Sequence, residues 1–160
     1  MSAHKNTHPV NLSMKPVANP HLRRTTRVLW VGWLVAVMAV LVVARVLTPS
    51  DAGYGTHLQL GLPPCGILLI TGLPCPSCGL TTSFAHMVRL QWIDAWHANP
   101  WGVALFVTML ASVPLAIHSA KRGKPLLETL HRYHAQKIAF GLILLGIGAW
   151  IGRVYRVWIG

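Results

Sequence analysis

Three long runs of apolar residues dominate the sequence, at residues 28–47, 100–118 and 138–158. A helix needs about 20 predominantly apolar residues to cross a hydrocarbon core of roughly 30 Å. Each run is close to that length, and the whole chain is 53% hydrophobic and only 11% charged, which is typical of membrane proteins rather than small soluble domains. The sequence therefore predicts an all-α integral membrane protein with three transmembrane helices.

Two positions refine these spans. Asn99 is suited to cap the second helix, with Pro100 at its first helical position. Arg153 and Arg156 interrupt the third run, so their side chains must either reach lipid headgroups or face a protein interior.

The basic residues predict the orientation of the chain. Five lysines and arginines precede the first span and five lie between the second and third, whereas the connection at residues 48–99 contains only Arg89. Because basic residues concentrate on the cytoplasmic side, we expect a cytoplasmic N-terminus and an external C-terminus. The net charge of +11 lies beside apolar spans, which favours contact with a lipid bilayer over binding of nucleic acid.

The predicted organisation has two parts. Residues 1–27 are polar and basic, contain three prolines, and are expected to form a disordered cytoplasmic tail. Residues 28–160 are expected to form a single helical membrane domain.

The connection between the first two spans is too apolar for a solvated loop. Residues 60–73 are bounded by prolines and glycines and are too short to span, which predicts a re-entrant or interfacial segment. Residues 80–97 have helical periodicity and predict an amphipathic helix in the membrane interface. Its apolar side would contain Phe84, Val88, Trp92, Ala95 and Trp96, and its other side Ser83, His86, Arg89 and His97.

All three cysteines, Cys65, Cys75 and Cys78, lie in this connection, on the side predicted to face outward. Three thiolates with one imidazole are a ligand set that zinc and other soft metals accept, and His86 or His97 could supply the imidazole. The pattern is incomplete, since strong zinc signatures contain two ligand pairs. Cys75 and Cys78 could equally form a structural disulfide or pack as small buried residues in a tight turn.

A redox role is the alternative function. The Cys-x-x-Cys pair precedes a predicted helix whose N-terminus would favour a thiolate, so that Cys75 would attack a disulfide and Cys78 would resolve the product. No lysine or arginine lies nearer in sequence than Arg89, and apolar surroundings raise the pKa of a thiol, which opposes this role.

The third span carries Gly141, Gly148 and Gly152, with the last two in a small-x-x-x-small spacing that permits close helix contact. Such contact could be made within the bundle, with another membrane protein, or by self-association. No paired carboxylates or phosphate-binding loop are present, so the sequence favours a protein without enzymatic activity.

The cysteine segment resembles a known family. Cys65, Gly72, Cys75-Pro76-Ser77-Cys78-Gly79-Leu80-Thr81 and the later Ala95 and Asn99-Pro100 are similar to the bacterial family catalogued as domain of unknown function 2752, whose pattern is C-x9-C-P-x-C-G-x-T-R. The resemblance implies a small helical membrane protein, which we expect in a bacterial inner (cytoplasmic) membrane, and brings no established activity. Thr82 stands where the family usually has arginine. We therefore expect an accessory or scaffold membrane protein with a structural or metal-binding cysteine turn, the alternative being a membrane-embedded thiol-disulfide oxidoreductase.

Overall fold

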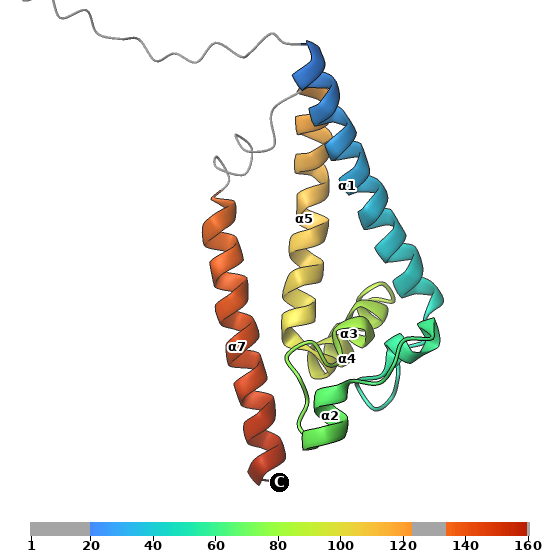
Figure 1. Ribbon diagram of the computed structural model, residues 1–160, viewed down its shortest axis with the longest axis vertical. Helices are drawn as coiled ribbons and strands as arrows, with labels where there is room; N and C mark the ends of the chain where they lie inside the picture. The colour runs from blue at the N-terminus through green and yellow to red at the C-terminus, as the bar shows by residue number, and fades with distance from the viewer. Residues whose placement is uncertain (1–19, 123–133, 160) are drawn as a thin grey trace, which may run out of the picture.

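The computed structural model describes residues 20–122 and 134–159, and in these ranges the chain is helical without strands. Three long helices, α1 (Pro20–Val46), α5 (Pro100–Arg122) and α7 (Ala135–Ile159), form its frame (Figure 1). Each has the length and apolar composition needed to cross a membrane. The predicted all-α fold with three membrane-capable helices is confirmed.

The first helix starts earlier than the apolar run. α1 begins at Pro20, inside the segment expected to be a disordered tail, because proline is tolerated in the first turn of a helix. Residues 1–19 of that expected tail lie outside the described residues. α5 begins at Pro100, where the sequence predicts it, and continues past Pro114.

α1 and α5 lie close together where α1 begins and α5 ends, and they diverge toward the opposite end (Figure 1). A hydrogen bond from Trp33 Nε1 to Ser112 Oγ, 3.0 Å long, joins the two helices. α7 lies along α5 on the side away from α1, and its C-terminus points toward the end where α1 and α5 diverge (Figure 1). The connection between α1 and α5 folds into the space at this end.

This connection contains a 3-10 helix, η1 (Thr56–Leu60), and three short α-helices, α2 (Gly66–Thr71), α3 (Leu80–Met87) and α4 (Trp92–Ala98). α3 and α4 pack against each other and against α5. Their shared core holds Met87, Ala95 and Phe106, and the Phe84 and Phe106 rings meet edge to face with centroids 5.3 Å apart. Such a pair adds to the stabilisation from burial of the two rings.

The single amphipathic helix predicted at residues 80–97 is wrong, because α3 and α4 are separated by a turn in which Leu90 has a φ of 62°. The guanidinium of Arg89 donates to the carbonyls of Ala44, Arg45 and Leu47 at the end of α1. The last carbonyls of a helix have no partner within it, so these bonds stabilise both the end of α1 and the turn. The predicted faces also differ: Ser83 is fully buried, whereas Trp96 is exposed.

The short helix α2 occupies most of the segment predicted to be re-entrant or interfacial. Its side chains Ile67, Leu69 and Ile70 are all exposed, Ile70 at 86%. Exposed apolar side chains on so short a helix fit a segment that contacts lipid, which remains a prediction.

The glycines of α7 behave differently from one another. Among the described residues, nothing would lie within 4 Å of a Cβ added at Gly141, Gly148 or Gly152, so the structure shows no close packing at the three predicted positions. The close approach is at Gly146, where a Cβ would lie 3.0 Å from the indole ring of Trp101. α7 therefore packs on α5 through a glycine that the sequence analysis missed.

Candidate functional site: a cluster of three thiols

The three cysteines meet at the end of the bundle where α1 and α5 diverge. Cys65 precedes α2, and Cys75 and Cys78 lie in the turn before α3. All three are free thiols, and their sulfur atoms lie within 4.8 Å of one another, with 3.1 Å between Cys75 and Cys78. Thiolates bound tetrahedrally to zinc at about 2.3 Å lie about 3.8 Å apart, so small side-chain movements would suit this cluster to one ion.

Asn99 joins the cysteine turn to α5. Its Oδ1 accepts hydrogen bonds from the backbone N–H groups of Trp101 and Gly102, which caps α5. Its Nδ2 donates to the carbonyls of Pro76, at 3.3 Å, and Cys78, at 3.1 Å. Asn99 is fully buried, so its one side chain hydrogen-bonds polar groups of both elements away from solvent.

α7 holds the same turn from the other side. The two terminal nitrogens of Arg153 donate to the carbonyls of Cys78, at 2.7 Å, and Pro76, at 2.9 Å. The indole of Trp150 donates to the carbonyl of Pro74 at 2.9 Å. The Arg153 guanidinium also interacts electrostatically with the thiols of Cys75 and Cys78. Arg153 therefore faces the protein interior, one of the two placements that the sequence left open.

Glycine is required at the end of the turn. Gly79 has a φ of 83° and precedes α3. A Cβ there would lie 2.5 Å from the carbonyl oxygen of Ala98 and 2.6 Å from that of Gly53. Only a residue without a side chain permits this backbone conformation and this approach of three chain segments.

The other motif residues have structural partners. Gly72 ends α2 with a φ of 68°, and Pro100 begins α5. Thr82 is fully buried and shares a 2.8 Å hydrogen bond with Thr56. Thr81 lies in the first turn of α3 and is half-buried.

The structure does not bring the predicted histidines to the thiols. In the described residues, the group able to hold a metal comprises only the three cysteines. His86 lies near the end of α3, with its Nδ1 2.9 Å from Oε1 of Gln91, and His97 is exposed on α4. The predicted fourth ligand is therefore not part of the cluster.

Comparison with known families supports the resemblance to domain of unknown function 2752. Residues 65–113 match the model of a family described as Protein of unknown function (DUF2752). Over about a third of its length, the chain is similar to the DUF2752 family. Neither the curated proteins nor the solved structures contain a match to the chain. The DUF2752 segment begins at Cys65 and continues into α5, so it includes all three thiols and Asn99 but not Trp150 and Arg153 of α7.

The pKa values of two thiols in the DUF2752 segment are shifted in opposite directions. Burial opposes ionisation of Cys75, but hydrogen bonds from Ser77, Cys78 and Cys65 outweigh it and lower the pKa of Cys75 from 9.0 to about 7. Burial, together with hydrogen bonds to Cys75 and Cys65, raises the pKa of Cys78 to about 12. The two thiols titrate as a pair, in which the first proton leaves near neutral pH and the thiolate forms on Cys75.

This acidity leads to a pH prediction. In the reduced, metal-free protein, thiolate absorbance at 240 nm should rise by one equivalent as the pH passes through about 7, because the lowered pKa of Cys75 places its ionisation there. The Cys75→Ser variant should lack this step. Titration of all thiols at or above about pH 8.5, the ordinary range of cysteine, would contradict the hydrogen-bonding account.

Arg153 gives a second prediction. The Arg153→Gln variant should unfold at lower temperature in detergent, with a loss of about 2–3 kcal/mol, since charge-assisted bonds to two turn carbonyls are removed. Arg153→Lys should restore only part of this loss, because an ammonium lacks the forked geometry.

Arg156→Gln is the matched control for Arg153→Gln. Arg156 is exposed on the same helix, and its Nε donates to the Gly152 carbonyl of α7 itself, at 3.4 Å. Equal losses of stability in the two variants would show that Arg153 acts through its positive charge alone rather than through hydrogen bonds to the cysteine turn.

Proposed function

We propose that the protein holds a soft metal ion, zinc or copper(I), on the thiolates of Cys65, Cys75 and Cys78 at one end of a membrane-embedded helical bundle. The observation that carries this proposal is the convergence of the three sulfur atoms within 4.8 Å, although Cys65 comes from a separate segment. Thiolate ligands select copper(I) and zinc among the common biological metals.

The surroundings of the thiols support the proposal. Metal sites depend on partners that fix the orientation of the ligands. Here Asn99 and Arg153 hold the carbonyls of Pro76 and Cys78, which fixes the backbone between the two paired cysteines. The guanidinium of Arg153 also offsets part of the negative charge that three thiolates would gather around one ion.

The number of ligands points to an accessory role. Structural zinc sites take four protein ligands, whereas sites that exchange a ligand keep one position open. The cluster supplies three sulfurs, which suits an ion held in three-coordinate form or shared with an external ligand. We therefore favour a component that holds or hands over a metal ion within a membrane assembly.

Metal content tests this proposal. The full-length protein, purified in detergent under reducing and anaerobic conditions, should retain about one zinc or copper(I) ion per chain after gel filtration. His97→Ala is the matched control, which should retain the metal, because His97 is exposed on α4 and lies outside the group of three thiols. A protein with three reduced thiols that retains neither metal would contradict the proposal.

Thiol-disulfide exchange remains the second candidate function, favoured by the 3.1 Å separation of the Cys75 and Cys78 sulfurs. The Cys75 thiolate would attack a disulfide of a substrate protein and displace one substrate thiolate. Cys78 would then attack the Cys75 sulfur, releasing the second thiolate and leaving a Cys75–Cys78 disulfide that an external dithiol must reduce. Cys65→Ser separates the functions, because metal binding needs all three thiols and exchange needs only two.

The orientation forms part of the proposal. The positive-inside distribution places the N-terminus in the cytoplasm and the thiols outside. In support, the described helices place the thiol cluster at the same end as the C-terminal part of α7. A reporter that is active only outside the cytoplasm should therefore be active when fused after Gly160. A reporter that is active only in the cytoplasm should be silent at the same place. A cytoplasmic signal there would overturn this orientation.

A further inference from the structure

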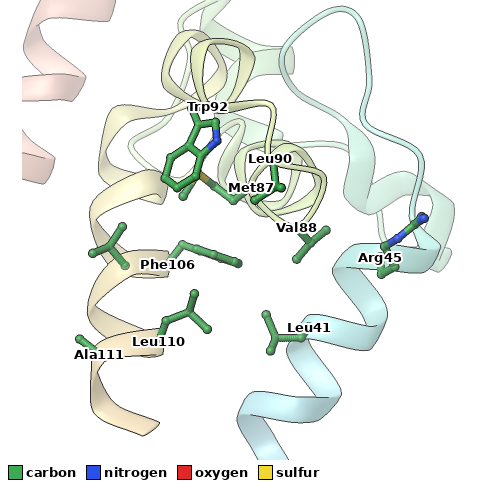
Figure 2. A pocket seen from close by; sticks show the side chains of 10 residues that line it. Leu41, Arg45, Met87, Val88, Leu90, Trp92, Phe106, Leu110 and Ala111 are labelled. Carbon is green, nitrogen blue, oxygen red and sulfur yellow. The ribbon is translucent and has the colours of Figure 1, made fainter. Parts of the chain in front are cut away.

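A groove with a volume of about 730 Å³ separates α1 from α5 next to the turn that joins α3 to α4 (Figure 2). Leu41 of α1 and Leu110 of α5 point toward each other across this groove, and Val88 points into it from the turn (Figure 2). All the residues that line it are apolar except Arg45. A concave apolar surface of this size suits an alkyl chain.

The groove lies within one leaflet of a membrane. Its α5 residues run from Phe106 to Ala111, and α5 begins at Pro100, at the end of the bundle that holds the thiols. At 1.5 Å per residue, Phe106 lies roughly 9 Å and Leu110 roughly 15 Å along the helix from Pro100. The latter distance is about half of a hydrocarbon core of roughly 30 Å, so the groove would hold part of an acyl chain of the leaflet at the thiol end.

Arg45 gives the groove a charged rim. It lies in the last turn of α1, beside the headgroup end of the groove, and its side chain is exposed. Arg89, close by, uses its guanidinium on the carbonyls at the end of α1. Within residues 20–122 and 134–159, by contrast, no hydrogen bond or ion pair engages the Arg45 guanidinium. Its donors are therefore available to an anion at the level of the headgroups.

From the apolar walls, the position within one leaflet and the charged rim together, we propose that the groove binds one anionic phospholipid. One acyl chain lies between Leu41 and Leu110, and the phosphate contacts Arg45. Trp92, which lies at the same end of the groove as Leu90, covers the glycerol region, where tryptophan is favoured. This site is distinct from the thiol cluster and does not depend on metal binding.

Photolabelling of the full-length protein in phosphatidylcholine vesicles tests the site. The probes are phosphatidylglycerol and phosphatidylcholine with a diazirine on the acyl chain, and the labelled peptides are identified by mass spectrometry. Phosphatidylglycerol should label α1 near Leu41 and α5 near Leu110 about fivefold more strongly than phosphatidylcholine, the preference that one basic residue near an anionic surface provides.

Two variants and their controls decide the outcome. Arg45→Gln should reduce the labelling by phosphatidylglycerol to that of phosphatidylcholine, and Leu110→Trp, which fills the groove, should abolish labelling there by both lipids. Arg156→Gln and Leu144→Trp, at exposed positions on α7, should change neither. Circular dichroism checks that each variant keeps its helices. Equal labelling by both lipids, a preference that survives Arg45→Gln, or a groove protected by a second copy of the chain would each overturn the proposal.

Discussion

Replacing Gly79 with alanine is expected to lower the free energy of unfolding by about 3–5 kcal/mol. The loss has two causes: a residue with a side chain is strained in the left-handed backbone conformation, and its Cβ overlaps with neighbouring atoms. The overlap is with backbone atoms, since the new Cβ would lie 2.5 Å from the Ala98 oxygen and 2.6 Å from the Gly53 oxygen. Backbone atoms cannot rotate away as the end of a flexible side chain can. The turn that carries Cys75 and Cys78 would therefore be displaced from the end of α4 and from Gly53.

Gly72→Ala is the matched control for this effect. Gly72 has a similar φ of 68°, but nothing lies within 4 Å of a Cβ built on it. Its substitution should therefore lose only the backbone contribution of about 1–2 kcal/mol. Both variants can be compared by chemical unfolding in mixed micelles. Equal losses in the two would contradict the close approach of three chain segments at Gly79.

The second large effect concerns the thiols themselves. Each of Cys65→Ser, Cys75→Ser and Cys78→Ser should lower the affinity for zinc or copper(I) by on the order of a hundredfold to a thousandfold. This range is what one ligand contributes when a complete site provides about 10–16 kcal/mol of binding free energy. Competition with a chelator of known affinity gives the numbers directly.

The pattern of affinity losses among the three variants is as informative as the size of each loss. If all three sulfurs bind one ion, Cys65→Ser should be as damaging as Cys75→Ser, and a Cys65→Ser/Cys75→Ser double variant should not show the sum of two independent losses. A normal affinity in Cys65→Ser would restrict the site to the paired cysteines and would favour thiol-disulfide exchange.

The sequence predicts those features that depend on local composition. The three apolar runs specify the membrane-capable helices because length and hydropathy alone decide whether a helix can cross a membrane. Asn99 followed by Pro100 predicts the start of α5 because capping involves only neighbouring residues. The grouping of the cysteines in one short segment likewise identified the region of the thiol cluster.

Contacts between distant segments could not be predicted in this way. The charge nearest in sequence to the cysteines is Arg89, yet Arg89 turns toward the end of α1, and its bonds break the expected helix in two. The guanidinium that reaches the cysteine turn is Arg153, from the third long helix. The sequence indicates this contact only in that Arg153 interrupts an apolar run. A charged residue in such a run needs a polar partner, but the sequence does not identify the partner.

The acidity of the thiols differs from expectation for a similar reason. Apolar surroundings were expected to raise the pKa of these thiols, and burial does so for Cys78. For Cys75, hydrogen bonds from Ser77 and from the other two cysteines outweigh burial and lower its pKa. Cys65 takes part in this network only because the fold brings α2 to the turn, a long-range arrangement that spacing along the chain does not specify.

The most direct test of the proposed metal site is X-ray absorption at the metal edge of the zinc- or copper(I)-loaded full-length protein. The account predicts a first shell of three sulfur atoms per metal, at about 2.3 Å for zinc. It also predicts no imidazole scattering, because His86 and His97 lie apart from the thiols. A first shell dominated by nitrogen or oxygen, or one with only two sulfurs that is unchanged in Cys65→Ser, would contradict it.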